Sequence, residues 1–227
     1  MTILTTEQIE ALKAIDTPTI CNAIETFKVR GRIEGFFGMD IKCLFPEMGS
    51  MVGYAVTVKV DSTTPNIPRD NDVWKQWVLA MDAAPKPIVL VFQDVGPELR
   101  KSAHSGEVMC TLAARLGCVG LVTDGGVRDV NEVREMGFQY FAAGTVASHG
   151  NPRLLEVNVP VTLDGVTVNR GDLLHGDING LTTIPLEIAA QISAEVEQVR
   201  NKEQPLINYM KSDNFTVEGL LKRLFEH

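Results

Sequence analysis

The pattern of apolar and polar positions is clearest between residues 105 and 145. Across residues 107–116 apolar side chains recur every three or four positions, which indicates an amphipathic helix, and Gly117 stands where a helix commonly ends. Residues 118–123 form an uninterrupted apolar run of strand length, so we expect a buried strand there.

The same alternation continues after a turn at residues 124–126. Asp129 and Glu132 have the spacing of a capping box and predict a second helix, which Gly137 would end. Residues 140–143 are then expected to form the next strand. Strands that alternate with helices are typical of a parallel sheet covered by helices.

Weaker patterns predict the elements on either side of this segment. Helices are expected at residues 5–15, 18–27, 71–83, 186–199 and 215–225, strands at 51–60 and 87–92, a hairpin with its turn at 164–165, and a second turn at 175–180. Residues 29–50 are rich in glycine and are expected to be loop. The whole pattern indicates a single α/β domain in which parallel units join an antiparallel β portion.

Charged residues are placed where such units carry their chemistry. A helix that returns across a parallel sheet begins at the edge where the strands end, so Glu107 should meet Arg128 and Asp129 there. Each has an ordinary alternative, because Asp129 can be a helix cap, Glu107 a first-turn acid that answers the helix dipole, and Arg128 a surface charge.

Backbone groups at the same edge could complete a ligand site. The free N–H groups of Val108, Met109 and Cys110, at the start of a helix, can receive a carboxylate. Gly125 and Gly126 would let a ligand approach the backbone, although paired glycines are more often only a turn.

The central motif resembles that of a known family. An acidic residue, twenty further residues and then Arg-Asp, seen here as Glu107, residues 108–127 and Arg128-Asp129, resembles the signature of the 4-hydroxy-4-methyl-2-oxoglutarate aldolases, which are related to the regulator of ribonuclease E activity A, the RraA-like proteins. Shorter similar stretches lie at residues 17–23, 53–58, 157–161 and 171–172.

The resemblance covers residues from about 15 to 185. It implies a swivelling β/β/α fold for one domain over residues 1–227, with its core at about 15–185 and a helical extension at 186–227. It also implies assembly as a homotrimer or homohexamer with the site at a subunit boundary. The loop at residues 29–50, with Glu34 and Glu47, is our candidate for what a neighbouring chain contributes.

The resemblance further implies a metal-dependent reaction. Asp129 would be the protein ligand of a Mg²⁺ or Mn²⁺ ion that keeps most of its waters, as hard cations prefer. Arg128 would pair with the substrate and stabilise an enolate, and Glu107, where the family often has Asp, would hold a metal-bound water that serves as acid or base. The N–H groups of Val108, Met109 and Cys110 would bind the carboxylate of pyruvate.

The chemistry gives a reason for the metal. Breaking a carbon–carbon bond beside a 2-oxo acid leaves an enolate, whose charge is held either by a Schiff-base lysine or by a Lewis-acid cation. No lysine lies between Glu107 and Thr145, which favours the cation. His104 and Asp94 are further candidates for the site, with a loop residue and a turn acid as their alternatives.

Composition narrows the protein class. A formal net charge of −8 disfavours a nucleic-acid partner, and no apolar run has the length of a membrane span. We expect no secretory signal at the N-terminus. The four widely spaced cysteines lack zinc-site spacing and indicate reduced thiols in the cytoplasm.

We therefore expect a class II pyruvate aldolase acting on 4-hydroxy-4-methyl-2-oxoglutarate or a similar diacid, with oxaloacetate decarboxylase activity through the same enolate. The alternatives are a non-catalytic regulator that binds a partner protein such as a ribonuclease, and a family member with an unrelated substrate. The regulator's version of the motif lacks the aspartate after arginine, and Asp129 is present here. The sequence has no glycine-rich nucleotide turn after its first strand, which disfavours a methyltransferase.

Overall fold

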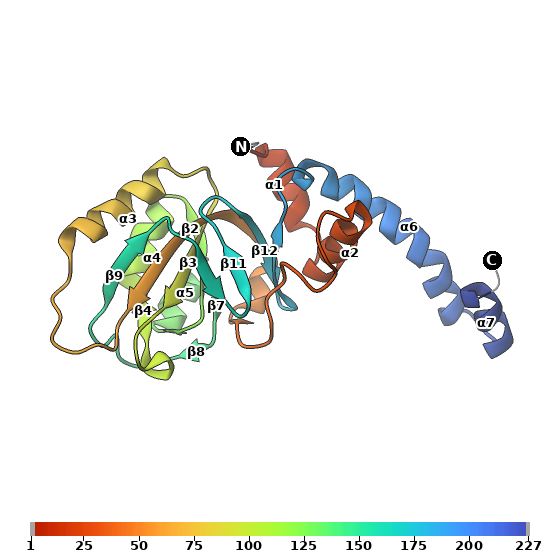
Figure 1. Ribbon diagram of the computed structural model, residues 1–227. Coiled ribbons are helices and arrows are strands. Elements are labelled where there is room, and N and C mark those ends of the chain that lie inside the picture. Colours follow the sequence, from red (N-terminus) through yellow and green to blue (C-terminus); the bar gives the residue numbers. More distant parts are fainter. Residues whose placement is uncertain (1–2, 226–227) are drawn as a thin grey trace.

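The computed structural model describes residues 3–225 and shows a mixed α/β fold built on one large, nearly closed sheet (Figure 1). Its centre is parallel, and neighbouring strands run in the order β7, β5, β3 and β2. Their bounds are Gln139–Ala142, Cys118–Thr123, Ile88–Asp94 and Met51–Asp61. The predicted parallel α/β core is confirmed, and the strand at residues 118–123 has the predicted bounds.

Antiparallel strands extend both sides of this centre. The added strands are β1 (Lys42–Cys43) beside β7, β9 (Arg153–Val157) and β12 (Leu173–Asp177) beside β2, and β13 (Gly180–Ile184) beside β12. The predicted hairpin is confirmed, with β10 (Val161–Leu163) and β11 (Val166–Val168) joined by Asp164 and Gly165, both at positive φ. This hairpin contributes apolar side chains to the core on one face of the sheet.

Helices cover the other face and one end of the sheet. In Figure 1, α3 (Asn71–Ala83), α4 (Glu107–Arg115) and α5 (Val130–Glu135) lie together beside the parallel strands, and their apolar side chains join a core around the fully buried Trp77 and Tyr140. The helices α1 (Thr6–Lys13) and α2 (Thr17–Phe27) pack with the start of α6 on the β12 and β13 end. Thr5 and Gln8 form a capping box at the start of α1, near the start of the helix expected at residues 5–15.

A second, smaller sheet positions the candidate site. The strands β4 (Ala103–Ser105), β6 (Gly126–Val127) and β8 (Gly144–Thr145) are parallel and follow, along the chain, the ends of β3, β5 and β7. Because each strand has only two or three residues, hydrophobic periodicity could not predict it. The residues that follow β4 and β6, which include Glu107, Arg128 and Asp129, therefore lie beyond the carboxyl ends of the large sheet's strands.

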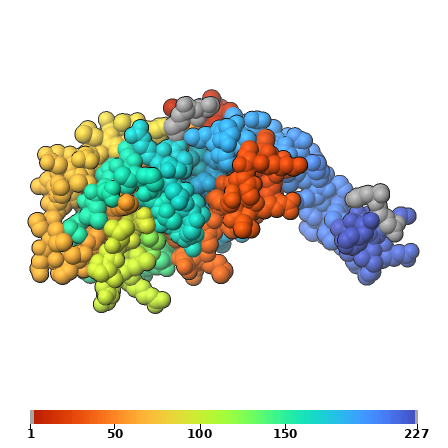
Figure 2. All heavy atoms as spheres, in the orientation of Figure 1, coloured from red at the N-terminus to blue at the C-terminus, as the bar shows by residue number. Residues whose placement is uncertain are grey.

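The C-terminal helices leave the body of the molecule. The helix α6 (Ile192–Lys211) packs on α2 through its first turns and then projects outward to α7 (Val217–Phe225), as Figures 1 and 2 show. Its start differs from the predicted helix at residues 186–199, because a 3₁₀ turn at Ala189–Gln191 precedes it, and it continues through Pro205. Within residues 3–225, no helix combines the length and hydrophobicity that crossing a membrane requires.

One other local prediction was wrong, and another was incomplete. Residues 175–177 are not part of a turn but belong to β12, which pairs with β13 and turns only at Ile178 and Asn179. The segment at residues 29–50 is mostly loop, yet it contains β1 and a 3₁₀ turn at Pro46–Met48.

Candidate functional site

The three residues of the central motif meet at the end of the small parallel sheet. The strand β4 leads through Gly106 into Glu107, the first residue of α4, and β6 leads directly into Arg128. The N–H of Arg128 donates to the carbonyl of Ser105 at 3.0 Å, which fixes the two strand ends side by side. The fold therefore brings Glu107 and Arg128 close together, as predicted from the position of helix starts at the carboxyl edge of a parallel sheet.

The Asp129 carboxylate joins the two halves of this site. Its Oδ2 accepts a hydrogen bond from the backbone N–H of Glu107 at 2.9 Å and lies 3.3 Å from Nε of Arg128. Asp129 thus satisfies the start of α4 rather than the start of its own helix, where no side-chain cap is formed. The predicted capping box of Asp129 and Glu132 was wrong for this reason.

The backbone around Asp129 is built to allow this contact. Asp129 adopts a left-handed conformation with φ of 54°, which aspartate tolerates better than most residues with a side chain. Opposite it, a Cβ atom at Gly106 would lie 2.2 Å from Oδ2 of Asp129 and 2.9 Å from Nε of Arg128. Only glycine at position 106 lets the carboxylate approach the N-terminus of α4.

The start of α4 offers two free backbone donors. The N–H groups of Val108 and Met109 have no hydrogen-bond partner among the described residues, as expected for the first turn of a helix. The N–H of Cys110 is not free, because it donates to the carbonyl of Gly106 at 3.0 Å. Of the three N–H groups predicted to bind a carboxylate, only those of Val108 and Met109 are available for it.

The backbone carbonyl of Arg128 accepts a hydrogen bond from a buried tyrosine. The hydroxyl of Tyr140 donates to the carbonyl of Arg128 at 3.4 Å and lies 3.1 Å from Sγ of Cys110 on α4. Burial raises the pKa of the Cys110 thiol to about 12, and burial also raises the pKa of Tyr140. Both groups therefore stay protonated and tie β7, α4 and the Arg128 backbone together.

The side chains of the motif remain accessible to a ligand. Arg128 and Asp129 keep 32% and 30% of their side-chain surface exposed, and Glu107 is exposed. The Oδ1 atom of Asp129 and the Glu107 carboxylate have no hydrogen-bond or ion-pair partner within residues 3–225. Carboxylate oxygens are suitable ligands for Mg²⁺ or Mn²⁺, so the donor chemistry fits such an ion.

A conventional multi-residue metal cluster is not part of this site. No group of three or more His, Cys, Asp or Glu side chains in the described part of the chain is arranged to hold a metal ion. A cation here would have one direct protein ligand, Asp129, and would fill its other positions with water or substrate, the arrangement that Mg²⁺ commonly adopts.

Gly125 and Gly126 line a separate hollow. They belong to a pocket of about 580 Å³, which we call the carboxyl-edge pocket, whose lining does not include Glu107, Arg128 or Asp129. Added Cβ atoms would clash with Ser102 at both glycines, at 2.3 Å from its Oγ and 2.8 Å from its carbonyl oxygen. Close packing against Ser102 therefore explains these glycines without a ligand.

His104 and Asp94 do not reach the surface of the site. His104 lies on β4 and is buried, and its Nδ1 is 3.4 Å from Oδ2 of Asp94 at the end of β3. Burial lowers the pKa of His104 to about 4 and raises the pKa of Asp94. The hypothesis that His104 contacts substrate was wrong, because His104 lies on β4 and is buried.

The two loop acids have local partners within this chain. Glu47 pairs with Nε of Arg134 at 3.0 Å, and Oε2 of Glu34 accepts the N–H of Gly31 at 3.0 Å. Whether a neighbouring chain uses this loop stays a prediction.

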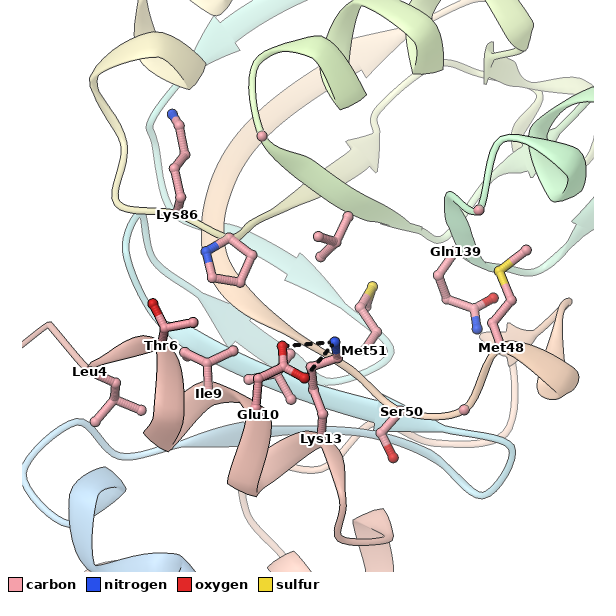
Figure 3. Close-up of a pocket in the computed structure, with 16 residues that line it drawn as sticks. Leu4, Thr6, Ile9, Glu10, Lys13, Met48, Ser50, Met51, Lys86 and Gln139 are labelled. Carbon is pink, nitrogen blue, oxygen red and sulfur yellow. Dashed lines mark hydrogen bonds and ion pairs between the residues drawn. The ribbon is translucent and has the colours of Figure 1, made fainter.

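A second pocket, of about 490 Å³, lies at the opposite end of the parallel strands, between α1 and the amino ends of β3, β5 and β7 (Figure 3). Both of its lysines are engaged. Lys13 pairs with Glu10 at 3.0 Å, and Lys86 donates to carbonyls at the end of α3, including that of Ala84 at 3.0 Å. This amino-edge pocket therefore offers no free cation to an acidic substrate.

Comparisons with known proteins agree with this fold and motif. Residues 17–183 match the model of the RraA-like family, described as Aldolase/RraA. A protein of Azotobacter vinelandii named "Putative 4-hydroxy-4-methyl-2-oxoglutarate aldolase" is 33% identical over 172 residues, which cover 74% of this chain and 93% of that protein. An uncharacterized protein of Methanocaldococcus jannaschii is 30% identical over 167 residues, which cover 73% of this chain and 76% of that protein.

A solved structure supports the fold independently. The Streptomyces coelicolor protein RraAS2, described as an unusual member of the RNase ES inhibitor RraA family, superposes with a TM-score of 0.68. The match covers 93% of this chain and all of that one at 22% identity.

Proposed function

Because this chain belongs to the RraA-like family, we propose that it is a lyase that cleaves a 4-hydroxy-2-oxo diacid, such as 4-hydroxy-4-methyl-2-oxoglutarate, to release pyruvate. The aldolase names of relatives matched over most of their length support this reaction class. The Arg128, Asp129 and Glu107 motif is the part of the chain to which we assign the chemistry.

One observation carries the proposal. The Asp129 carboxylate reaches both the Glu107 N–H and the Arg128 guanidinium from a left-handed backbone conformation, beside a glycine that leaves room for it. An aspartate needed only to cap its own helix would not require this conformation. The second carboxylate oxygen, Oδ1, has no partner within residues 3–225, which supports a role for it toward a ligand.

The residues of the site divide the reaction among them. The N–H groups of Val108 and Met109 would hold the carboxylate of the pyruvate unit at the start of α4. The planar guanidinium of Arg128 would pair with its 2-oxo oxygen, where negative charge develops as the C3–C4 bond breaks. A divalent cation bound to Asp129 would supply Lewis-acid stabilisation of the same charge.

Proton transfer falls to Glu107. Through a water molecule, its carboxylate would accept the proton of the 4-hydroxyl group as the bond breaks and would return a proton to C3 of the enolate. Oxaloacetate loses carbon dioxide through the same pyruvate enolate, so we extend the proposal to decarboxylation of oxaloacetate.

The test is metal-dependent release of pyruvate from both substrates, measured with lactate dehydrogenase as the coupling enzyme. We expect EDTA to abolish turnover and Mg²⁺ or Mn²⁺ to restore it. Arg128→Gln should lower kcat/KM by about a hundredfold or more, the usual effect of losing one group that stabilises developing charge. Asp129→Asn should abolish metal-dependent turnover. The chain should stay folded, because asparagine tolerates the left-handed conformation. Full activity in either variant would contradict the assignment.

A regulator is the second candidate, because the Streptomyces coelicolor neighbour is described as a member of an RNase inhibitor family. A regulator should release no pyruvate from either substrate under any metal condition. It should also bind a ribonuclease equally well with Asp129 or with Asn at that position. Metal-dependent turnover lost in Asp129→Asn therefore separates the two functions.

A further inference from the structure

The carboxyl-edge pocket carries chemistry that the proposed reaction does not use. It has a volume of about 580 Å³, within the range of small-molecule sites, and lies where β3, β5 and β7 end. Its lining includes Lys42, Arg100 and Asp124, together with the backbone of Gly144. Its lining excludes Glu107, Val108, Met109, Arg128 and Asp129, to which we assign the aldolase chemistry.

Two cations of this pocket are free of ion pairs. Lys42 on β1 and Arg100 on the 3₁₀ turn at Leu99–Lys101 form no ion pair with any residue between 3 and 225. They come from segments far apart in sequence and line one concavity. In the amino-edge pocket, by contrast, both lysines are satisfied within the protein.

The negative groups of the same pocket limit the charge of a ligand. Asp40 and Asp124 also line it, so a highly charged anion such as a triphosphate would be repelled. An anion with two carboxylates matches the two unpaired cations, since each carboxylate can pair with one of them. The volume also exceeds what a single carboxylate group needs.

Gly144 leaves space for such a ligand. A Cβ atom built on Gly144 would meet no atom within 4 Å, and its backbone is in a region open to any residue. Unlike Gly125 and Gly126, Gly144 is therefore not required by close packing. Because Gly144 lines the pocket, we expect a larger side chain at this position to reduce the space for a ligand.

We propose that the carboxyl-edge pocket binds a small dicarboxylate between Lys42 and Arg100, at a site distinct from Arg128 and Asp129. The segment from Asp124 to Asp129 connects the two sites, because its first three residues line the pocket and its last two belong to the motif. The binding proposal stands whether or not the chain is an aldolase.

The experiment is isothermal titration of the full chain with succinate, which has two carboxylates and no oxo group to react. EDTA is present, so the proposed cation site stays empty of metal. We expect saturable binding of one succinate per chain, and binding of acetate at least about tenfold weaker. Arg100→Gln and Lys42→Gln should each weaken succinate binding by at least about tenfold, and Gly144→Leu should abolish it.

Matched controls identify the site. Lys101→Gln removes the same charge from the neighbouring residue, which does not line the pocket, and should leave succinate binding unchanged. Arg128→Gln should also leave it unchanged, even if that variant has lost all aldolase activity. Circular dichroism and the thermal unfolding midpoint establish that each variant is folded.

Three results would overturn the proposal. They are absence of saturable succinate binding up to about 10 mM, equal weakening by Lys101→Gln, and loss of binding in Arg128→Gln with no effect of Arg100→Gln. The last would place dicarboxylate binding at the motif instead. If Gly144→Leu does not fold, the two charge variants still decide the outcome.

Discussion

At the scale of single residues, Gly106 decides whether the site can form. It is the residue that lets the Asp129 carboxylate reach the N–H of Glu107, since a Cβ would lie 2.2 Å from Oδ2. We expect Gly106→Ala to displace the carboxylate and to lower metal-dependent turnover by about a hundredfold, comparable to losing a charge-stabilising group. The measurement is pyruvate release at saturating Mg²⁺, with the Mg²⁺ concentration for half-maximal rate.

Gly144→Ala is the matched control for this substitution. Its added methyl group meets no atom within 4 Å, so its turnover should equal that of the unchanged chain. Wild-type turnover in Gly106→Ala would show that the contact between Asp129 and Glu107 has no role in activity. A loss of activity caused only by unfolding would appear as a large fall of the thermal midpoint, which the control does not share.

At the scale of elements, Tyr140 connects β7 and α4 to the Arg128 backbone. Tyr140→Phe removes the hydroxyl that lies within hydrogen-bond distance of both the Arg128 carbonyl and Cys110. We expect the free energy of unfolding to fall by about 1 kcal/mol, the usual value of one buried hydrogen bond. We also expect kcat to fall severalfold, because Arg128 loses a positioning contact, with a smaller change in KM.

Tyr54→Phe separates positioning from stability. The Tyr54 hydroxyl accepts the N–H of Leu4 at 2.8 Å and is equally buried, but it lies on β2 away from the motif. It should lose similar stability and keep full turnover, as judged by urea unfolding and initial rates. If both tyrosine variants reduce kcat equally, the effect of Tyr140 is only structural.

The elements also show what the sequence could predict. The parallel strands, α3 and the first turn of α1 follow from periodicity and capping, because tertiary packing and local preference agree there. The small sheet of β4, β6 and β8 is held by pairing between distant segments, and its strands are too short to show a period. That sheet is what buries His104 and places Arg128, so periodicity could identify the motif but not its surroundings.

The sequence also could not predict the direction of the side chains at the site. Asp129 has the sequence context of a helix cap, yet its left-handed backbone turns the carboxylate toward α4. The tertiary contact with the Glu107 N–H therefore replaced the local one with Glu132. Similarly, Gly125 and Gly126 have the composition of a ligand loop, but their glycines are explained by contact with Ser102.

At the scale of the whole molecule, the half-buried Asp124 and the buried His104 give the stability opposing pH dependences. Burial raises the pKa of Asp124 to about 6, above its ordinary 3.8, so the protonated form favours folding. Its stabilising contribution is present below about pH 4 and is lost as the pH rises through 6. Burial lowers the pKa of His104 from 6.5 to about 4, so its contribution is present above about pH 6.5 and is lost as the pH falls toward 4.

Replacing Asp124 should remove one of these dependences. In Asp124→Asn the side-chain oxygen can still accept the N–H of Asp94, a bond of 2.8 Å in the native chain, but no charge is buried. The charged groups around it are Asp94, whose pKa burial also raises, and Asp40, Lys42 and Arg100 of the same pocket. We expect Asp124→Asn to unfold at a higher temperature than the native chain above pH 6, and at nearly the same temperature at pH 4.

The difference between the two unfolding curves from pH 4 to 8 isolates Asp124, because the contribution of His104 is common to both chains. Asp82→Asn on α3 changes the net charge equally at an exposed position, so it measures the general effect of lowering the charge of −8. A stabilisation by Asp124→Asn that is the same at every pH, or one that Asp82→Asn reproduces, would mean that burial of Asp124 does not control it. A stabilisation that grows between pH 4 and 6 would instead show that keeping the Asp124 carboxylate charged at the carboxyl-edge pocket costs stability.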